Sequence, residues 1–254
     1  MRRSFVDAAA QQLLSARSSR ASLTRFAEGL EPISPEESYA IQDAVAALAG
    51  AIGGWKVAVY GPGQPTRFAP IFATTIADHP ATIGAESLRM IGVEAEIVFR
   101  VAKDLPSGSI PRTRSAAMKA IASIHPAIEV VDRRFENFRA VSPLSVLADN
   151  QNSGALIVGS AMDGVRDLAA PGFAMFRDGA LVGAPERNPV GDPVELFIQL
   201  AEHCAARGSM LEAGMAVTTG SCSGVALVPP GSSVEVRLGA RVLVSCAFPI
   251  TRNA

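Results

Sequence analysis

Apolar residues recur at helical spacing near the start of the chain, at Phe5, Ala8, Ala9, Leu13 and Leu14. This pattern predicts an amphipathic helix, although the five arginines and single acid of the first 25 residues would also suit a transit peptide. A second helix is predicted from Ser-Pro-Glu-Glu at 34–37, because serine caps a helix, proline fits its first position and the last glutamate completes a capping box.

After the second helix the chain changes to short β-branched runs broken by glycine and proline, which predict strands. The predicted strands cover 54–59, 87–101, 127–132, 155–158, 174–177, 216–219, 233–238 and 241–247. The last two, joined through Gly239-Ala240, predict a hairpin. Two helices interrupt the strands, a short one at 115–123 and one that begins at Asp192-Pro193 and ends at Gly208.

The order of the predicted elements indicates the fold class. Helices first, followed by many strands and few helices, predict an α+β fold built on curled antiparallel or mixed sheets. We expect one structural unit with two parts. An N-terminal helical segment covers 1–53, and a β-rich part over 54–254 carries the chemistry.

Composition narrows the function classes. A formal net charge of −1 argues against a protein that binds nucleic acid by neutralising phosphates. No apolar run reaches the roughly 18 residues of a membrane span. The three cysteines lie far apart in the sequence, so neither a disulfide framework nor a zinc knuckle is predicted, and a reducing cytoplasm is the expected location. The common nucleotide-binding motifs are absent from the sequence.

The stretch G-V-E-A-E-I-V-F-R at 92–100 predicts a strand with two glutamates on one face. Side chains at i and i+2 of a strand point the same way, so the carboxylates of Glu94 and Glu96 lie roughly 5–7 Å apart. At an effective dielectric constant of about 20 they repel each other by about 2–3 kcal/mol. Solvent on an outer sheet face, a basic neighbour, a shared proton or a metal ion would each offset that repulsion.

Two further residues suit a metal site. Glu129 is an acid within the apolar stretch 127–131, and a buried acid needs a partner. Because Mg²⁺ binds through a few carboxylates, Glu94, Glu96 and Glu129 together form a candidate site, with a solvated sheet face as the alternative. Lys56 stands beside the only tryptophan, where it binds a carboxylate, moves a proton or extends from a strand end into solvent.

Six segments together resemble the fumarylacetoacetate hydrolase superfamily, within it the branch of 2-oxopent-4-enoate hydratases and 4-oxalocrotonate decarboxylases. They are G-W-K-V-A (54–58), V-E-A-E-I-V-F (93–99), K-D-L-P (103–106), P-A-I-E-V-V-D-R-R (126–134), A-D-N-Q-N-S-G (148–154) and L-E-A-G-M-A-V-T-T-G-S (211–221). They occur in the family's order and extend over essentially the whole chain. The resemblance implies a mixed β-roll or sandwich with helices around it, assembled as a homo-oligomer.

The resemblance also implies residue roles. Glu94, Glu96 and Glu129 match three acidic ligands of Mg²⁺ or Mn²⁺, and Lys56 matches a catalytic lysine close to the metal-bound substrate. The stretch 219–221 matches a loop that holds a substrate carboxylate, and 150–153 matches a polar loop of the same pocket. The implied substrate-binding residues are Arg67, Phe68, Asn150, Asn152, Ser153, Thr219, Gly220 and Ser221.

Three positions depart from the family pattern. Arg67 stands where an acid is usual, Asn152 replaces a usual serine, and Met215 replaces an acid. An arginine cannot act as a general base, but it can bind a second carboxylate through two nitrogens. The departures favour an altered substrate, such as a dicarboxylate, or a decarboxylase.

The resemblance implies a divalent-metal-dependent lyase, foremost a hydratase, that acts on a small 2-oxo or 2-hydroxydienoic acid of aromatic meta-cleavage catabolism. The alternatives are a 4-oxalocrotonate-type decarboxylase, an acylpyruvate hydrolase and, in a different class, a non-catalytic scaffold or activator of a partner enzyme. The expected partners are the small 2-oxo acid, further copies of this chain and a pathway partner enzyme.

Overall fold

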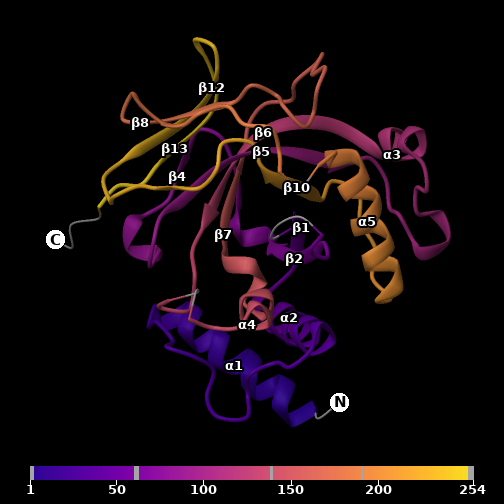
Figure 1. Ribbon diagram of the computed structural model, residues 1–254, viewed down its shortest axis with the longest axis vertical. Helices are drawn as coiled ribbons and strands as arrows, with labels where there is room; N and C mark the ends of the chain where they lie inside the picture. The colour runs from indigo at the N-terminus through magenta and orange to yellow at the C-terminus, as the bar shows by residue number, and fades with distance from the viewer. Residues whose placement is uncertain (1–2, 60–62, 138–139, 190, 251–254) are drawn as a thin grey trace.

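Two N-terminal helices pack against each other below the sheets in the view of Figure 1. The computed structural model describes residues 3–59, 63–137, 140–189 and 191–250. Helix α1 (Arg3–Ser19) and helix α2 (Pro35–Ala49) confirm the two predicted N-terminal helices. The short helix α4 (Pro143–Ala148) lies beside α2. The three helices share a small apolar core that includes Phe5, Leu13, Phe26, Ile41, Val45, Phe135 and Ala148.

Predicted caps begin two of the helices. The Ser34 hydroxyl accepts a hydrogen bond from the backbone N–H of Glu37 at 3.3 Å, and the Glu37 carboxylate accepts one from the N–H of Ile33 at 2.9 Å. The Asp192 carboxylate accepts the N–H of Val194 at 3.0 Å and begins α5 (Pro193–Ala206). Each cap satisfies N–H groups that the first helical turn leaves without an intrahelical partner.

The larger sheet holds the central strands. Its eight strands follow the order β2-β1-β10-β5-β6-β7-β3, with β11 also paired to β5. Strands β5 and β6 run antiparallel at its centre, whereas β1 runs parallel to β10. The bounds are β1 (Ile52–Ala58), β2 (Arg67–Phe72), β3 (Ile76–Asp78), β5 (Gly92–Val101), β6 (Ile121–Val131), β7 (Ser153–Val158), β10 (Ala216–Ser221) and β11 (Ala226–Leu227).

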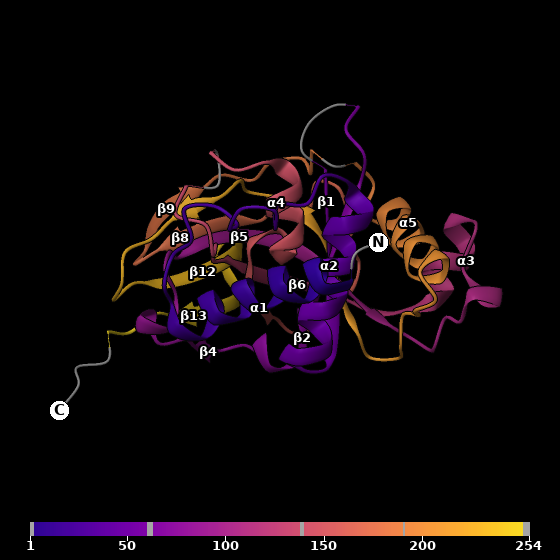
Figure 2. The same cartoon turned by 90° about the horizontal axis from the view of Figure 1, so that it is seen from below.

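The smaller sheet has five strands in the order β4-β13-β12-β8-β9. They are β4 (Ala81–Thr82), β8 (Ala174–Arg177), β9 (Ala180–Gly183), β12 (Ser233–Leu238) and β13 (Arg241–Ala247). Strands β12 and β13 contact β6, so the main apolar core lies between the two sheets. Helix α5 packs on β10, and α3 (Arg114–Ala120) lies beside α5 at one side of the molecule (Figure 2).

The predicted α+β class with mixed sheets is confirmed, and β12 and β13 form the predicted hairpin. The predicted helix at 115–123 is too long, because α3 ends at Ala120 and β6 begins at Ile121. Pairing with β5 through Val101 draws Ile121 into the sheet, where a β-branched side chain is favoured. Strand β2 is absent from the prediction because Pro70 suggests a loop; the sheet accepts this proline on its edge strand.

Among the described residues, no helix combines the length and the apolar character that a membrane crossing requires. Helices α2 and α4 contact β2, and α5 packs on β10. The N-terminal core joins the helices to the segment after β6, since the N–H of Leu23 donates to the carbonyl of Arg134 at 2.8 Å. Phe26 meets Phe135 edge-to-face there, with ring centroids 5.2 Å apart.

Phe135 is fully buried in this contact, so its replacement tests how strongly the helices are attached. Phe135→Ala should lower the free energy of unfolding by about 3–5 kcal/mol, because it removes apolar contacts and leaves a cavity. Urea unfolding followed by circular dichroism measures the change. Ile33→Ala, at a side chain that is 83% exposed, is the control and should change stability by less than about 0.5 kcal/mol. Equal urea midpoints for Phe135→Ala and Ile33→Ala would contradict this packing of Phe135.

Candidate metal and active site

Three glutamates from two paired strands converge on one face of the larger sheet. Glu94 lies directly across from Glu129 in the β5–β6 pair, and Glu96 shares the face of Glu94 two residues further along β5. One carboxylate oxygen of each glutamate lies within 4.8 Å of those of the other two. Within the described part of the chain, this is the one group of acidic, histidine or cysteine side chains with the spacing of a metal site. Three such oxygens suit a hard divalent cation.

Burial raises the free energy of the charged form of this cluster. Only 3% of Glu96 and 1% of Glu129 is exposed, so a solvated sheet face does not describe these side chains. Burial, and then repulsion by the Glu129 carboxylate, raise the pKa of Glu94 to about 7. The same two causes, in the same order, raise the pKa of Glu96 well above its ordinary value. The fold therefore holds these carboxyls where protons or a cation must offset their charge.

Lys56 on β1 brings a positive charge to the cluster. Its ammonium group pairs with Oε1 of Glu129 and donates to the carbonyl of Gln151 at 3.2 Å. Gly54 allows β1 to approach β10 this closely, because a Cβ atom at position 54 would lie 2.3 Å from the carbonyl oxygen of Ala216. One ammonium group beside three carboxylates leaves negative charge that a divalent cation would offset.

An irregularity in β10 directs two donors at Glu96. Relative to β5, strand β10 carries one extra residue between Thr218 and Ser221, which makes a β-bulge. The Thr218 hydroxyl and the N–H of Gly220, the latter at 3.0 Å, both donate to Oε2 of Glu96. Gly220 has a φ of 97°, a conformation that favours glycine. The buried amide of Asn188 donates to two carbonyls of the bulge at 2.7 and 3.3 Å.

A left-handed turn before β7 presents the carbonyl that Lys56 contacts. Residues 150–152 have φ values of 49°, 51° and 60°, although none of them is glycine. Each such residue costs on the order of 1–3 kcal/mol and persists only where its surroundings hold it. Arg134, which is fully buried, donates to the carboxylate of Asp149 at 2.5 Å and to its carbonyl at 2.9 Å. This ion pair anchors the start of the turn and so fixes the surroundings of Lys56.

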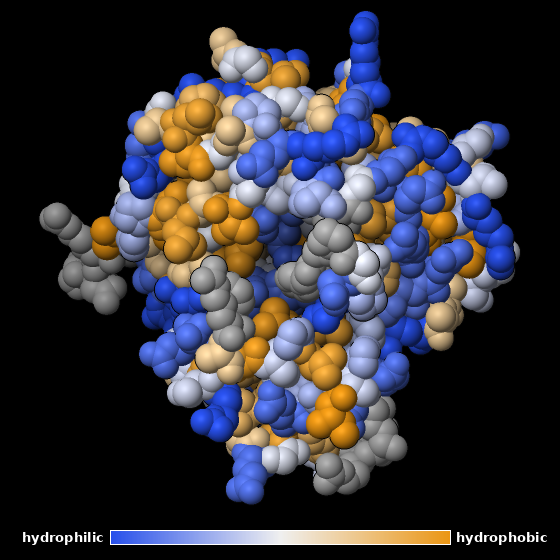
Figure 3. Space-filling model, viewed as in Figure 1, coloured by the Kyte–Doolittle hydropathy of each residue, from blue (hydrophilic) through white to orange (hydrophobic). Residues whose placement is uncertain are grey.

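The glutamates open into a cavity of about 530 Å³. In the space-filling view, the face seen in Figure 1 is hollowed near its middle, and hydrophilic residues lie in the hollow (Figure 3). Besides the three glutamates and Lys56, the lining consists of Val57, Ala58, Val59, Met90, Val131, Arg133, Gln151, Asn152, Pro189, Gly220, Ser221, Val225 and Leu227. The cavity thus combines charged and polar side chains with apolar ones, as a binding site for a small organic acid requires.

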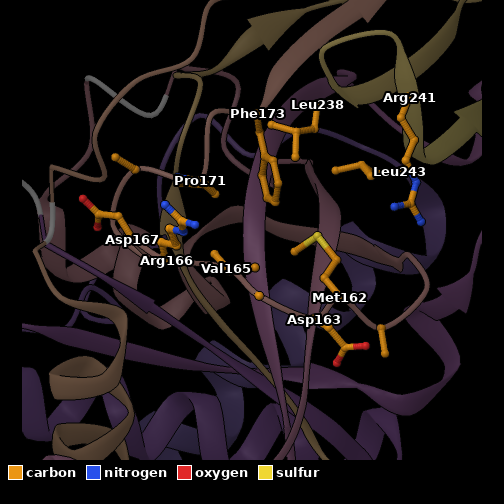
Figure 4. Close-up of a pocket in the computed structure, with 13 residues that line it drawn as sticks. Met162, Asp163, Val165, Arg166, Asp167, Pro171, Phe173, Leu238, Arg241 and Leu243 are labelled. Atoms are coloured by element: carbon orange, nitrogen blue, oxygen red, sulfur yellow. The ribbon is translucent and has the colours of Figure 1, made fainter.

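A second cavity of about 490 Å³ lies beside the segment 161–173 and the β12–β13 hairpin (Figure 4). Its two acids, Asp163 and Asp167, lie at separate places in the wall. Asp167 pairs with Arg187 at 2.8 Å, and this ion pair is half exposed to solvent. No pair of acids converges there, so this cavity lacks the arrangement of the glutamate site.

Seven of the residues predicted for the site line the first cavity. They are Lys56, Glu94, Glu96, Glu129, Asn152, Gly220 and Ser221. The Ser221 hydroxyl hydrogen-bonds to Glu94 and stabilises its charged form. The amide oxygen of Asn152 is buried and has no hydrogen-bond partner within the described ranges. A ligand or water in the cavity is therefore the natural donor to it.

Arg67 and Phe68 do not line this cavity. Both lie on β2, where Phe68 pairs with Val57 rather than with Lys56, so its ring lies on the other face of the sheet. There Phe68 stacks on His203 with ring centroids 4.4 Å apart. Arg67 donates to the carbonyl of Pro143 at 2.9 Å. Besides Lys56, the described lining contains one other cation, Arg133, which follows the end of β6.

The other three predicted residues outside the lining support the backbone of the site. The amide of Asn150 donates to a carbonyl of β2 at 3.4 Å, and the Thr219 hydroxyl donates to a carbonyl of β5 at 3.4 Å. The carbonyl of Ser153 accepts a hydrogen bond from Arg134 at 3.0 Å. Their side chains or carbonyls thus stabilise the left-handed turn and the bulge.

Three residues of the site are missing from the sequence prediction: Thr218, Asn188 and Arg133. No local pattern marks Thr218 or Asn188, because their roles depend on the bulge in β10. Arg133 does have a signal, since it stands four residues after Glu129 and an extended chain brings i and i+4 to one face. The sequence contains this spacing, but it does not show that the pairing of β6 continues past Val131.

An α+β fold of two mixed sheets, in which three converging glutamates and a buried lysine line one cavity, defines a protein with a candidate divalent-metal site. The chain belongs to the fumarylacetoacetate hydrolase family. Residues 40–251 match the family model described as fumarylacetoacetate (FAA) hydrolase C-terminal. The match covers every residue of the glutamate site.

Named relatives fall into two groups. A 4-oxalocrotonate decarboxylase of a Pseudomonas species is 31% identical over 160 residues, which are 63% of this chain and 60% of that protein. A 2-keto-4-pentenoate hydratase 2 of Dechloromonas aromatica is 30% identical over 193 residues, 74% of this chain and 71% of that protein. The aligned part of this chain therefore spans about three fifths of the length of the first relative.

A solved structure shares the fold along nearly its full length. The 4-oxalocrotonate decarboxylase from Pseudomonas putida G7, complexed with magnesium and adipate, has a TM-score of 0.83 to this chain. The superposition covers 98% of both chains at 23% sequence identity. The likeness supports the assignment of the fold, including the N-terminal helices.

The raised pKa of Glu94, about 7 against an ordinary 4.5, makes stability depend on pH when no metal is bound. A carboxyl with a raised folded-state pKa stabilises the fold below its unfolded-state pKa, and this contribution is lost as pH rises through the folded-state value. Glu94→Gln lacks that dependence. We measure the difference between two melting temperatures in EDTA, that of Glu94→Gln minus that of the unsubstituted protein. We expect this difference to increase from pH 5 to pH 8. A difference that stays constant, measured by scanning fluorimetry, would contradict the burial of this charge.

Divalent metal should stabilise the protein through the same carboxylates. At pH 8, Mg²⁺ or Mn²⁺ at 100 times its dissociation constant should add about 2.7 kcal/mol of stability. Glu96→Gln should lose most of this increment, because it removes one charged ligand. Glu202→Gln, at an exposed acid on α5, is the matched control and should keep the full increment. Isothermal titration with Mn²⁺ measures the affinity directly, and equal affinity for the two variants would rule out Glu96 as a ligand.

Proposed function

We propose that this chain is a divalent-metal-dependent lyase, foremost a hydratase, that acts on a small 2-oxo or 2-hydroxydienoic acid. The observation that carries the proposal is the convergence of Glu94, Glu96 and Glu129 beside Lys56, in the wall of a cavity large enough for a small molecule. Relatives named 2-keto-4-pentenoate hydratase support this reaction class. The substrate belongs to the compounds that aromatic meta-cleavage catabolism produces.

The donor set supports Mg²⁺ or Mn²⁺ as the cofactor. Glu94, Glu96 and Glu129 would hold the ion through carboxylate oxygens, which hard divalent cations prefer. The similar decarboxylase structures are described as complexes with magnesium and adipate and with calcium and acetate. When bound, such an ion acts as a Lewis acid on the oxygens of a 2-oxo acid.

Residues of this chain would then move protons and exclude solvent. Lys56 stands between Glu129 and the carbonyl of Gln151, so its ammonium group has a fixed position from which to transfer a proton to the substrate's carbon chain. The buried amide oxygen of Asn152 can accept a hydrogen bond from the water that adds at C4 of a 2-oxo-3-enoate. The apolar walls, including Val131, keep bulk water from the reacting carbons.

A 4-oxalocrotonate-type decarboxylase is the second candidate. The first relatives carry that name, and the cavity wall contains Arg133, whose charge suits an acid with two carboxylates. An acylpyruvate hydrolase would use the same metal site. A non-catalytic scaffold or activator of a partner enzyme is the alternative of another class, and the preserved acid cluster makes it less favoured than catalysis.

We also propose that the chain works as a homo-oligomer in the cytoplasm. Apolar side chains of the smaller sheet support assembly, since Leu181 is 57% exposed, Leu238 48% and Val242 42%. The three cysteines are buried free thiols, which suits a reducing compartment. Light scattering coupled to gel filtration tests the assembly, and a monomer at micromolar concentration would contradict it.

An ultraviolet assay tests the proposed reaction. With Mg²⁺, the chain should consume 2-hydroxypenta-2,4-dienoate or 2-oxohex-3-enedioate, and EDTA should abolish the loss of absorbance. Lys56→Gln should lower kcat by about 10²- to 10⁴-fold, the usual contribution of a positioned proton donor. The exposed Lys119→Gln is the control and should keep full activity.

Release of carbon dioxide from the dicarboxylic substrate would identify the decarboxylase, whereas addition of water without gas release would identify the hydratase. Turnover that persists in EDTA would overturn the metal-dependent mechanism. Full activity of Lys56→Gln would remove Lys56 from the reaction. Lys56→Gln and Lys119→Gln should both bind Mn²⁺ in titrations run beside the assay. This control ensures that a loss of metal binding is not mistaken for a loss of proton transfer.

A further inference from the structure

A serine and a histidine form a hydrogen-bonded pair on β6, outside the lining of the glutamate cavity. Oγ of Ser123 lies 2.7 Å from Nε2 of His125, and both residues are half-buried. Residues two apart on a strand share a face, and Glu129 lies on that same face four residues after His125, with its Cα atom about 13 Å away. Buried Ala127 and Val158, which pair with each other, lie between. The pair is therefore separate from the metal site.

The second ring nitrogen of His125 determines which way the pair is polarised. Nδ1 of His125 lies 2.8 Å from the carbonyl oxygen of Gly159. A carbonyl oxygen can only accept a hydrogen bond, so Nδ1 carries the proton and Nε2 of the neutral ring is the acceptor. The Ser123 hydroxyl then donates to Nε2. A hydroxyl that donates to an imidazole, which a third group orients in turn, is the arrangement of an activated nucleophile and its base.

The fold holds this carbonyl and this histidine in place. Gly159 follows β7, and its N–H donates to the carbonyl of Pro126 at 2.8 Å. A Cβ atom at position 159 would lie 2.7 Å from the carbonyl oxygen of Leu243 and 2.7 Å from Cγ of Pro126, so a side chain there would displace the backbone. Pro126 also restricts the backbone of the preceding His125 to the extended region. The acceptor of the Nδ1 proton is thus fixed by packing.

A positive charge lies beside the serine. Arg100 on β5 stands directly across from Ser123 in the β5–β6 pair, and the Cβ atoms of such residues are roughly 4.5–5.5 Å apart on one face. The Arg100 guanidinium donates to the carbonyl of Gly214 at 3.1 Å and pairs with Asp78 at 3.8 Å. These contacts keep it near the sheet surface. A cation at this position favours the negative charge that develops on a carbonyl oxygen under nucleophilic attack.

We propose that Ser123 is a nucleophile, with His125 as its general base, that accepts acyl groups from small activated esters. Oγ of Ser123 bonds to the acyl carbon and passes its proton to Nε2 of His125. The ester C–O bond breaks, and the leaving group takes that proton and departs as an alcohol. Water then attacks the acyl-serine with His125 again as base, which releases the acid and restores the hydroxyl. Because Ser123 is half-buried on a strand, the smallest acyl groups reach it best.

A second serine and histidine in the same chain offer a matched comparison. Oγ of Ser160 lies 3.5 Å from Nε2 of His79, which is too far for a strong hydrogen bond. Nδ1 of His79 is buried and has no hydrogen-bond partner among the described residues, so no third group orients this ring. Ser160 is exposed, whereas Ser123 is half-buried. Exposure thus favours reaction at Ser160, and hydrogen-bond geometry favours reaction at Ser123.

Acetylation by 4-nitrophenyl acetate tests the proposal. The protein is treated in EDTA, released 4-nitrophenolate is followed by absorbance, and peptide mass spectrometry locates the acetyl group. We expect acetyl-Ser123 in the unsubstituted protein. His125→Gln should lower the rate of acetylation at this position by about 10²- to 10⁴-fold, the usual contribution of a general base. His79→Gln and Ser160→Ala are the matched controls and should keep the full rate at Ser123.

The position of the acetyl group in the unsubstituted protein keeps the proposal testable even if a variant fails to fold. Acetyl groups on Ser160 or on lysines but not on Ser123 would overturn it, since exposure or ordinary amine reactivity would then decide the reaction. An unchanged rate at Ser123 in His125→Gln would also overturn it. Ser123→Ala should lose the acetylation at this position and keep the Mg²⁺-dependent reaction of the glutamate site. Loss of both in a variant of unchanged melting temperature would contradict the separation of the two sites.

Discussion

The antiparallel register of β5 and β6 is the constraint on which the site depends. It places Glu94 across from Glu129 and leaves Glu96 on the same face, so three acids from two strands meet without any loop to bring them together. A shift of one residue would turn one strand's glutamates to the opposite face, because side chains alternate along a strand. The apolar partners of these residues, such as Val93 and Ile97, lie in the main core and resist such a shift. The core thus determines the position of the acids.

Placing three acids together, two of them buried, is unfavourable, and much of the surrounding structure offsets that cost. Lys56 pairs with Glu129, while Thr218 and the N–H of Gly220 donate to Glu96. These contacts need a glycine where β1 meets β10 and a bulge in β10, which are features that weaken an ordinary sheet. The raised pKa of Glu94 shows that the compensation is incomplete while no cation is bound. A bound divalent ion would therefore lower the free energy of the folded site, because it would offset the remaining repulsion among the carboxylates.

The residues that line the cavity differ in what they contribute to the function. The glutamates and Lys56 suit any reaction that begins with a chelated 2-oxo acid, so hydratases and decarboxylases can share them. A substrate's remaining groups would contact the other residues of the lining. The rest of the lining includes Asn152, Val131 and Arg133.

The sequence alone determined the elements whose signals are local. Strands appear in every predicted region, the caps at Ser34 and Asp192 form as expected, and the alternation of Glu94 and Glu96 placed both on one face. Tertiary structure decided what depends on pairing between distant segments. It placed Arg67 and Phe68 outside the cavity, drew residues 121–123 into a strand and extended the pairing of β6 toward Arg133. Local patterns follow from backbone periodicity, which a short stretch of sequence contains. Strand neighbours and bulges depend on how the whole chain fills its core, and no short stretch of sequence contains that information.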